Sequence, residues 1–385
     1  MFLGRKSLVS IQNETWKKTR KVVTKAFHWE YLKNIVPHIN KLTKKFIGQI
    51  LSRDEDKPIE FYKASKCLTL DVIGVITFGY DFGCTNTLEP SPMASALEYL
   101  LSELDRRRFV NVLDPRSNFY WWPTESNRRY EECDSVIRST ISEQIELRKG
   151  RSTTTASNGQ DLLAQLLRAR KDESSDMDDE ALYDALITFV FAGYDTTSVL
   201  MTYLFYILAT NKDIERVSLE EVHAVLGTDP NVLPTYDDLT TKFPYCTAVL
   251  NEILRLYPPV PLTSRNLVEP LTLSLSEPGV PPSDFRQITL PTGTMMYIPI
   301  WFIHREESNF PNPEEFDPHR FLGDQSAHQS PAFVPFSAGA RDCVGRRLAM
   351  LEALTIFVNI VREISFETVD GYEFVPGSTG TLQRP

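Results

Sequence analysis

The sequence contains few of the residues that build disulfide frameworks or histidine-based metal sites. Five cysteines occur among 385 residues, scattered and without metal-site spacing among themselves. An odd, scattered set is typical of a reducing compartment rather than of a disulfide-bonded secreted domain. The six histidines form no ligand constellation, and His304 has no partner at a ligand spacing. Zinc or iron sites built from histidines and carboxylates are therefore not supported.

The chain also lacks an excess of positive charge and a hydrophobic leader. It carries 41 Lys and Arg against 51 Asp and Glu, a formal net charge of −10, which argues against nucleic acid as the main partner. Its first residues show neither a signal peptide nor an apolar run long enough to cross a membrane. With 42% hydrophobic residues and no linker rich in Gly, Ser or Pro, residues 1–385 are expected to form a single domain.

What the chain does have is a turn near its C-terminus, FSAGARDCVG (336–345), suited to presenting a thiolate to a metal. Cys343 leads directly into an apolar helical segment, whose first N–H groups and dipole stabilise an anion. Arg341 adds a positive charge two residues before the sulfur. Gly339 and Gly345 permit a tight turn and close approach to a bulky group. The alternative is an inert, buried cysteine before a helix.

This turn resembles the signature of the cytochrome P-450 superfamily, F-x-x-G-x-R-x-C-x-G. Its fixed positions are matched by Phe336, Gly339, Arg341, Cys343 and Gly345. The resemblance implies a mainly α fold with small β-sheets, a triangular helical prism that holds haem b between a long central helix and the cysteine loop. It makes Cys343 the axial metal ligand of the iron and assigns the other four residues to cofactor binding.

A second informative stretch is the apolar run EALYDALITFVFAGYDTTSVLMTYLFYILA (180–209). It follows a Ser/Asp-rich segment, Ser174 to Asp179, that suits a helix N-terminus. Because the run is apolar nearly all round, it belongs in a large core or in a membrane. Asp195, near its middle, would be costly at membrane depth, so this aspartate needs a partner or a function in either environment.

The segment Ala192–Thr197 matches A-G-x-D-T-T, another motif of the same family. The resemblance implies that Asp195 and Thr196 are catalytic, an acid and an alcohol that pass protons to dioxygen at the haem. Thr196 can bond back to a carbonyl, open the helix locally and admit water. Gly193 would let the helix pass close to the haem. The alternative is an ordinary buried helix with a satisfied polar kink.

Three further residues are assigned to the haem by the resemblance. Trp16 and Arg20 form W-x-x-x-R in a basic segment, one helical turn apart on one face, and a guanidinium fork suits a carboxylate. The family makes them propionate contacts, together with Arg265. The neighbouring lysines would suit docking of an acidic redox partner on the cysteine side. The implied substrate-pocket residues are Phe189, Ala192, Val260 and Leu262.

Glu252 and Arg255 form E-x-x-R on a predicted helix that ends at Tyr257-Pro258-Pro259. Alone, such a pair is usually an exposed ion pair of little energetic weight. With Arg320, in FDPHRF (316–321), it resembles the buried Glu-Arg-Arg triad of the family. That triad is structural and would lock the loop that presents the cysteine.

The rest of the chain is predicted to be helical, except for one region of short strands. Residues 14–53 and several stretches of 58–150 indicate helices, 150–160 indicates an exposed loop, and 267–303 alternates like strands of a small sheet. Breaks are expected at Asp81–Gly83, Glu89–Pro92 and Trp121–Pro123.

The resemblance, which covers most of residues 14–385, implies a monooxygenase that hydroxylates or otherwise oxidises a lipophilic small molecule, in secondary metabolism. It would use O2 and electrons from an NADPH-dependent cytochrome reductase, with cytochrome b5 as a further donor. Related eukaryotic proteins lie on the cytosolic face of the endoplasmic reticulum membrane and begin with an anchor and the first sheet strands. We interpret the chain as N-terminally truncated relative to them.

Three alternatives stay open from sequence. One is a haem-thiolate isomerase or dehydratase that needs no reductase, although such relatives often lack the acid–alcohol pair. Another is a truncated, non-catalytic relative that binds haem poorly. The third is an all-α membrane or scaffold protein.

Overall fold

The computed structural model describes residues 3–54, 57–113, 124–150, 161–170, 177–275, 284–323, 327–372, 377–379 and 381–383. Helices dominate these residues, and the strands form three two-stranded antiparallel sheets. The helices in chain order are α1 (Asn13–Ala26), α2 (Trp29–Leu51), α3 (Phe61–Phe78), α4 (Pro92–Leu113), α5 (Glu125–Gly150), α6 (Leu162–Arg170), α7 (Asp179–Thr210), α8 (Lys212–Leu226), α9 (Tyr236–Thr241), α10 (Pro244–Leu256), α11 (Ile300–Ile303) and α12 (Arg346–Ile360).

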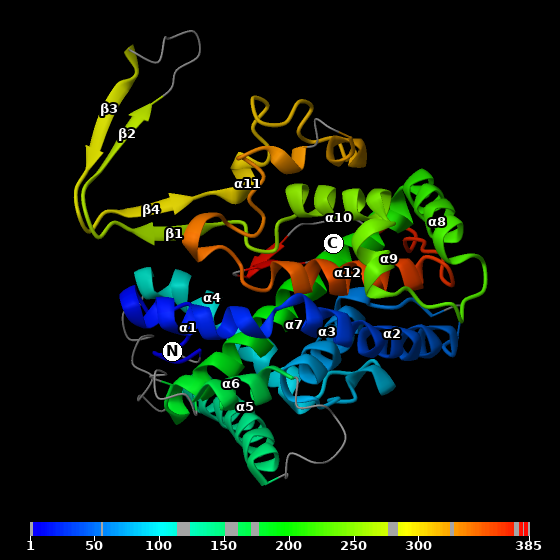
Figure 1. Ribbon diagram of the computed structural model, residues 1–385, viewed down its shortest axis with the longest axis horizontal. Helices are drawn as coiled ribbons and strands as arrows, with labels where there is room; N and C mark the ends of the chain where they lie inside the picture. Colours follow the sequence, from blue (N-terminus) through cyan, green and yellow to red (C-terminus); the bar gives the residue numbers. More distant parts are fainter. Residues whose placement is uncertain are drawn as a thin grey trace.

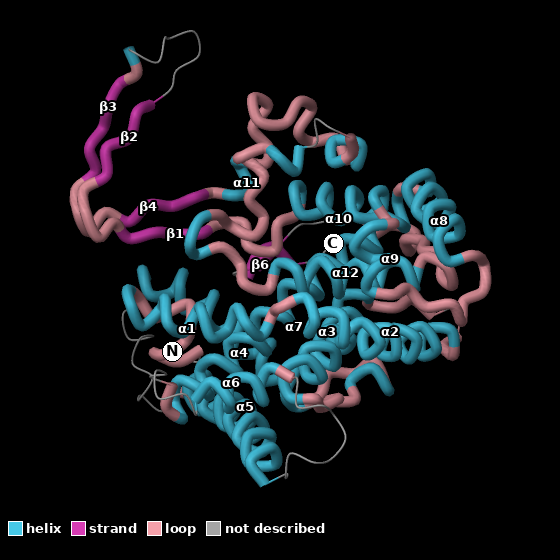
Figure 2. Tube along the Cα trace, viewed as in Figure 1, coloured by secondary structure: helices cyan, strands magenta, loops and turns pink. Residues whose placement is uncertain are grey.

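The strands lie late in the chain. They are β1 (Thr263–Asn266), β2 (Leu271–Leu275), β3 (Arg286–Leu290), β4 (Met295–Ile298), β5 (Gly377–Thr379) and β6 (Thr381–Gln383). β1 pairs with β4, with Thr263 opposite Ile298, and β2 pairs with β3, with Leu271 opposite Leu290. These four strands project from one edge of the helical body (Figure 1), whereas β6 lies among the helices (Figure 2) and contacts α7.

The central element is α7, a helix of 32 residues. The side chain of Asp178 caps it by accepting a hydrogen bond from the N–H of Ala181 at 2.8 Å, as the Ser/Asp-rich start predicts. Among the described residues it is the one helix apolar and long enough to cross a membrane, and most of that apolar window is buried inside the fold. The run is therefore a core helix, and the membrane-spanning interpretation of it is not supported.

Helices from both halves of the chain surround α7. Its most extensive contact is with α3, and α10 and α12 also pack against it. In turn α12 lies against α2 and α10, so that α10, α12 and α7 cross the middle of the molecule while α5 and α6 lie at one end (Figure 1). The start of α12 and the middle of α7 are thereby placed in one helical core.

Most of the predicted elements are confirmed, with four differences. Strands β5 and β6 were not predicted, and residues 300–303, which were expected in the strand region, form α11. The helical stretch 14–53 is divided into α1 and α2, because His28 adopts an extended conformation (φ −68°, ψ 153°) before α2. Strand β1 was not predicted; its four residues, TSRN, are polar and carry no apolar alternation. The expected break at Trp121–Pro123 and, apart from Gly150 at the end of α5, the expected loop 150–160 lie outside the described residues.

Candidate functional site

The Cys343 turn is a tight loop that ends at the first residue of α12. Gly339 has φ +76°, a left-handed conformation that favours glycine. The N–H of Cys343 donates to the carbonyl of Phe336 at 2.9 Å and closes the loop. Gly345 has φ −85°, so the backbone there does not require glycine; a Cβ would instead contact the sulfur of Cys343 at 3.8 Å.

The thiol of Cys343 is solvent accessible although many protein atoms surround it. Burial raises the pKa of this thiol, while the N–H groups of Gly345 and Arg346 and the charge of Arg20 act in the opposite direction. The N–H groups at the start of α12 thus act in the direction that the sequence predicts, but burial outweighs them and the pKa of the thiol is raised. A thiolate here needs a metal cation on the sulfur, which displaces the proton.

Two arginines from distant segments bind the cysteine loop. Arg20 on α1 donates to the carbonyl of Asp342 at 2.7 Å and to its carboxylate at 2.6 Å. Arg265 on β1 donates to the hydroxyl of Ser337 at 3.0 Å. Both arginines among the three predicted propionate contacts thus bind residues of the turn that carries Cys343.

The third arginine, Arg341, belongs to the loop itself. Its guanidinium lies 4.2 Å from the ring centroid of Trp16 and donates to the carbonyl of Ile11 at 3.0 Å. Burial, and then the charges of Arg265 and Arg20, lower the pKa of Arg341. Arg341 is therefore close enough to Arg265 and Arg20 to feel the charge of both, and positive charge gathered in this way favours carboxylate binding.

The middle of α7 opens one face to solvent within an otherwise buried helix. Ala192 is exposed and Thr196 is half-buried, whereas Asp195 is buried. The hydroxyl of Thr196 donates to the carbonyl of Ala192 at 2.6 Å, as predicted. The predicted local opening of the helix is absent, because α7 continues as α-helix through this segment; a hydroxyl can share the i−4 carbonyl without breaking the helix.

Gly193 has a packing role that the sequence did not predict. A Cβ on this residue would lie 2.6 Å from Cδ1 and 2.8 Å from Cγ1 of Ile73 on α3. The absent side chain therefore allows α3 and α7 to pack closely, and the close approach of α7 to a haem stays a prediction.

Helix α1 links the cysteine turn to α7. Arg20 contacts the turn, and Phe27, just after the helix, packs against Phe189 of α7 with ring centroids 5.5 Å apart. Arg20 and Phe27 are seven residues apart, and a helical segment of that length spans about 10 Å. Ala192 lies one helical turn beyond Phe189, so α1 contacts both the cysteine turn and the part of α7 that carries the open face.

The predicted pocket residues differ in exposure. Val260 and Leu262 are 37% and 43% exposed, whereas Phe189 is buried. A hollow of about 510 Å³ at the start of α7 is lined by none of the predicted site residues; it is bounded by Gly4, Arg5, Arg138, Ser142, Asp179, Glu180, Tyr183 and Asp184.

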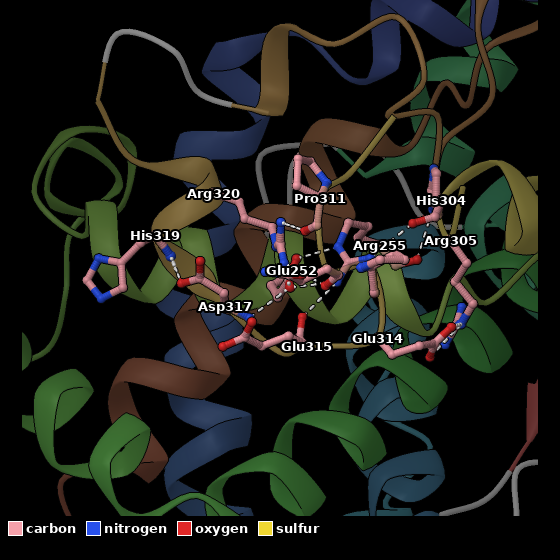
Figure 3. A network of polar contacts seen from close by, with 12 residues as sticks. Glu252, Arg255, His304, Arg305, Pro311, Glu314, Glu315, Asp317, His319 and Arg320 are labelled. Atoms are coloured by element: carbon pink, nitrogen blue, oxygen red, sulfur yellow. Dashed lines mark hydrogen bonds and ion pairs between the residues drawn. The ribbon is translucent and has the colours of Figure 1, made fainter. Parts of the chain in front are cut away.

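The predicted triad forms around a fully buried ion pair. Arg255 binds the carboxylate of Glu252 through two nitrogen atoms, at 2.7 and 2.8 Å, and both side chains have no exposed surface. Figure 3 shows Glu252 between Arg255 and Arg320. The remaining guanidinium N–H groups of Arg255 donate to backbone carbonyls at 2.6 to 3.0 Å, those of His304, Pro313 and Glu315.

Arg320 completes the triad less tightly. Its Nε lies 3.5 Å from Oε1 of Glu252, a carboxylate oxygen that also accepts the N–H of Asp317 at 2.9 Å. Its terminal nitrogen atoms donate to the carbonyls of Pro311 and Asn312. The three charged residues therefore fix the segment 311–317 by its backbone, which agrees with a structural role.

The sequence did not predict how closely His304 belongs to this network. One ring nitrogen, Nδ1, lies 3.0 Å from the carbonyl of Arg255, and the other, Nε2, accepts the N–H of Val334 at 3.0 Å. Because Nε2 accepts, Nδ1 carries the proton and the ring is neutral. Burial lowers the pKa of His304 to about 4. The imidazole thus joins the end of α10 to the start of the cysteine loop, in the structural role expected for a lone histidine.

The donor set matches a haem that is bound through its iron and its two carboxylates. The accessible thiol offers the axial ligand, and Arg20, Arg265 and Arg341 offer positive charge beside it. Small, exposed residues lie on the loop before the cysteine and on the open face of α7, namely Ala338, Gly339, Ala340 and Ala192. The residues present therefore fit this cofactor.

Comparison with known proteins agrees with this geometry. The family model described as "Cytochrome P450" matches residues 1–381. Cytochrome P450 4A14 of Rattus norvegicus is 32% identical over 366 residues, 90% of this chain and 66% of the relative. Cytochrome P450 4A7 of Oryctolagus cuniculus is 31% identical over 370 residues, 92% of this chain and 68% of the relative. The chain spans about two thirds of the length of these relatives.

A solved structure supports the fold independently. The structure described as "Retinoic acid bound cyanobacterial CYP120A1" superposes with a TM-score of 0.79 at 22% identity, covering 100% of this chain and 79% of that one. It confirms the predicted fold class, mainly α with small sheets. The chain belongs to the cytochrome P450 family, whose members bind haem through a cysteine thiolate.

Proposed function

We propose that the chain forms the haem-thiolate domain of a monooxygenase, with Cys343 as the axial ligand. The observation that carries this proposal is the accessible thiol at the start of α12, flanked by three arginines and linked by α1 to the open face of α7. When bound, the haem supplies oxygen activation, and its thiolate ligand favours O–O cleavage. The match of residues 1–381 to one family model supports a single domain.

The chain's own residues bind and orient the cofactor. Arg20, Arg265 and Arg341 bind the propionates, and Trp16 holds the guanidinium of Arg341 in place by stacking. The N–H groups of Gly345 and Arg346 hydrogen-bond the sulfur and tune its electron donation. In the structure these arginines bind backbone carbonyls, hydroxyl groups and, in the case of Arg20, the carboxylate of Asp342, and a propionate would share or replace these acceptors.

Two residues on α7, Thr196 and Asp195, transfer protons to the site. Thr196 presents its hydroxyl at the open face, where Oγ1 holds a proton that can be donated toward the reacting oxygen, and Asp195 restores that proton from the buried side of the helix. The presence of both groups favours monooxygenation over a reductase-independent isomerase or dehydratase.

The substrate class is a lipophilic small molecule, for which Val260, Leu262 and Ala192 supply accessible apolar surface. Electrons come from an NADPH-dependent reductase or cytochrome b5, which would dock near the exposed cations Lys17, Lys21 and Arg347 on the two helices beside the cysteine turn. A place on the cytosolic face of the endoplasmic reticulum membrane and a role in secondary metabolism stay predictions from the sequence resemblance.

The test is spectroscopic and then enzymatic. Protein expressed with iron and porphyrin, reduced and treated with carbon monoxide, should show the red-shifted Soret band of a thiolate-ligated haem. With a reductase it should consume NADPH and O2 when a lipophilic substrate is oxidised. A colourless protein, or turnover that needs neither NADPH nor O2, would overturn the proposal.

A further inference from the structure

A buried lysine on α3 contacts the catalytic region of α7. The side chain of Lys66 is 4% exposed, and its Nζ lies 3.9 Å from Oδ1 of Asp195 and 3.5 Å from Oε1 of Glu98. The same ammonium lies 4.3 Å from the ring centroid of Tyr62 and 5.6 Å from that of Tyr194. Two carboxylates and two aromatic faces therefore surround one buried cation.

The surroundings of the Lys66 ammonium stabilise a positive charge between two carboxylates. An ammonium group loses its hydration on burial, and only nearby negative charge and polarisable faces compensate that loss. The two acids differ in exposure: the side chain of Asp195 is 1% exposed, whereas that of Glu98 on α4 is 46% exposed. Lys66 thus joins a fully buried carboxylate to one that reaches solvent.

The helix that carries Lys66 is fixed against the relevant part of α7. Lys66, Thr69 and Ile73 lie at helical spacing on one face of α3. The hydroxyl of Thr69 donates to the carbonyl of Tyr194 at 2.9 Å, and Ile73 packs into the space left by Gly193. The ammonium is therefore positioned by the same interface that positions Asp195.

We propose that Lys66 is a positioning residue for the proton relay of α7. It keeps Asp195 ionised at the α3 interface, one residue from Thr196, so that this carboxylate can accept a proton arriving from the side of Glu98 and pass it to the hydroxyl of Thr196. Protons that replenish the relay then enter from the α3–α4 side rather than through the substrate pocket. This inference rests on the proposed monooxygenase function.

The first test measures the pairing without turnover. Thermal unfolding of the full chain is compared for Lys66→Met, Asp195→Asn and the double variant. Lys66→Met should lower Tm by on the order of 5 °C, because it leaves a buried carboxylate without its cation, and the same change should cost clearly less in the Asp195→Asn background. Lys63→Met removes an exposed lysine of the same helix, which pairs with Glu60, and should leave Tm unchanged. Additive effects of the two substitutions would overturn the inference.

The second test determines whether Lys66 affects the reaction itself or only the stability of the fold. The Lys66→Met holoenzyme should keep the Soret band of the carbon monoxide complex and the substrate KM, while kcat falls by about tenfold and hydrogen peroxide replaces product. Lys66→Arg, which keeps the charge, should restore most of kcat. Unchanged kcat and coupling in Lys66→Met would overturn the inference while the proposed function stands. Absence of the thiolate band in the wild-type protein would instead overturn the proposed function.

Discussion

A β-carbon on Gly193 would lie 2.6 Å from Cδ1 of Ile73, closer than side-chain carbons approach one another in folded proteins. The two residues belong to α7 and α3, the pair of helices with the most extensive contact in the fold. The absence of one side chain therefore sets the distance between the helix that carries Asp195 and the helix that carries Lys66.

Substitution of Gly193 should accordingly destabilise the fold. Gly193→Ala should lower the free energy of unfolding by about 1–3 kcal/mol through overpacking, measured by urea denaturation. Ile73→Val in the same chain should recover part of the loss, because it removes Cδ1. A stable Gly193→Ala protein with reduced haem content would show that the glycine faces the cofactor instead.

Replacement of the proposed ligand should remove the haem signature. Cys343→Ala should abolish the red-shifted Soret band of the reduced carbon monoxide complex, because no other sulfur is placed at the start of α12. Cys133→Ala changes a half-buried cysteine on α5 and should leave the band intact. Persistence of the band in Cys343→Ala would exclude this residue as the ligand.

The buried ion pair should contribute far more than an exposed one. Glu252→Ala leaves the guanidinium of Arg255 buried without its carboxylate and should cost about 3–5 kcal/mol of unfolding free energy, or prevent folding. Glu220→Ala breaks an exposed pair with Arg216 and should have no measurable effect. Chemical denaturation monitored by circular dichroism would compare the two variants. Equal stability of both variants would contradict the triad.

The imidazole of His304 predicts a loss of stability in acid. Its pKa is lowered from 6.5 to about 4 in the folded protein, so the unfolded chain binds the extra proton first. Stability is fully present above pH 6.5 and is lost as the pH falls from about 6.5 to about 4, by up to about 3 kcal/mol. Urea midpoints across this range should fall less steeply in His304→Asn than in the wild type. His38→Asn, at an exposed position on α2, should behave as the wild type does.

The hydroxyl of Thr196 should control how electrons are used. Thr196→Ala should lower the product formed per NADPH by on the order of tenfold, with hydrogen peroxide released instead. Thr202 on the same helix makes an equivalent back-bond to the carbonyl of Ser198 at 2.7 Å, but in a buried position. Thr202→Ala is therefore the matched control. Full coupling in Thr196→Ala would reject its proposed role.

Residues that act through fixed spacing along the chain could be predicted from sequence. Cys343 and the start of α12 form one continuous segment, and Glu252 and Arg255 lie one turn apart on one helix, so motif and geometry coincide. The cap of α7 was predictable for the same reason, since Asp178 bonds to the N–H three residues later.

Contacts between distant segments could not be predicted in this way. Nothing local to Gly193 shows that Ile73 fills the space beside it, and no spacing rule connects Lys66 with Asp195. His304 is bonded to Arg255 and Val334, which are 49 and 30 residues away. The pKa of Cys343 likewise depends on how many atoms the fold places around the sulfur, which outweighs the local effect of the helix start.

The order in which the partners of α7 are synthesised has a consequence for biogenesis. Its apolar surface is covered partly by α3, which leaves the ribosome before it, and partly by α10 and α12, which leave after it. During elongation part of the apolar surface of α7 therefore stays exposed to solvent until α12 has emerged from the ribosome. We expect nascent chains arrested after α7 has left the ribosome, but before α12 has, to be captured by chaperones and full-length chains to be released from them, which crosslinking of stalled ribosomes would show.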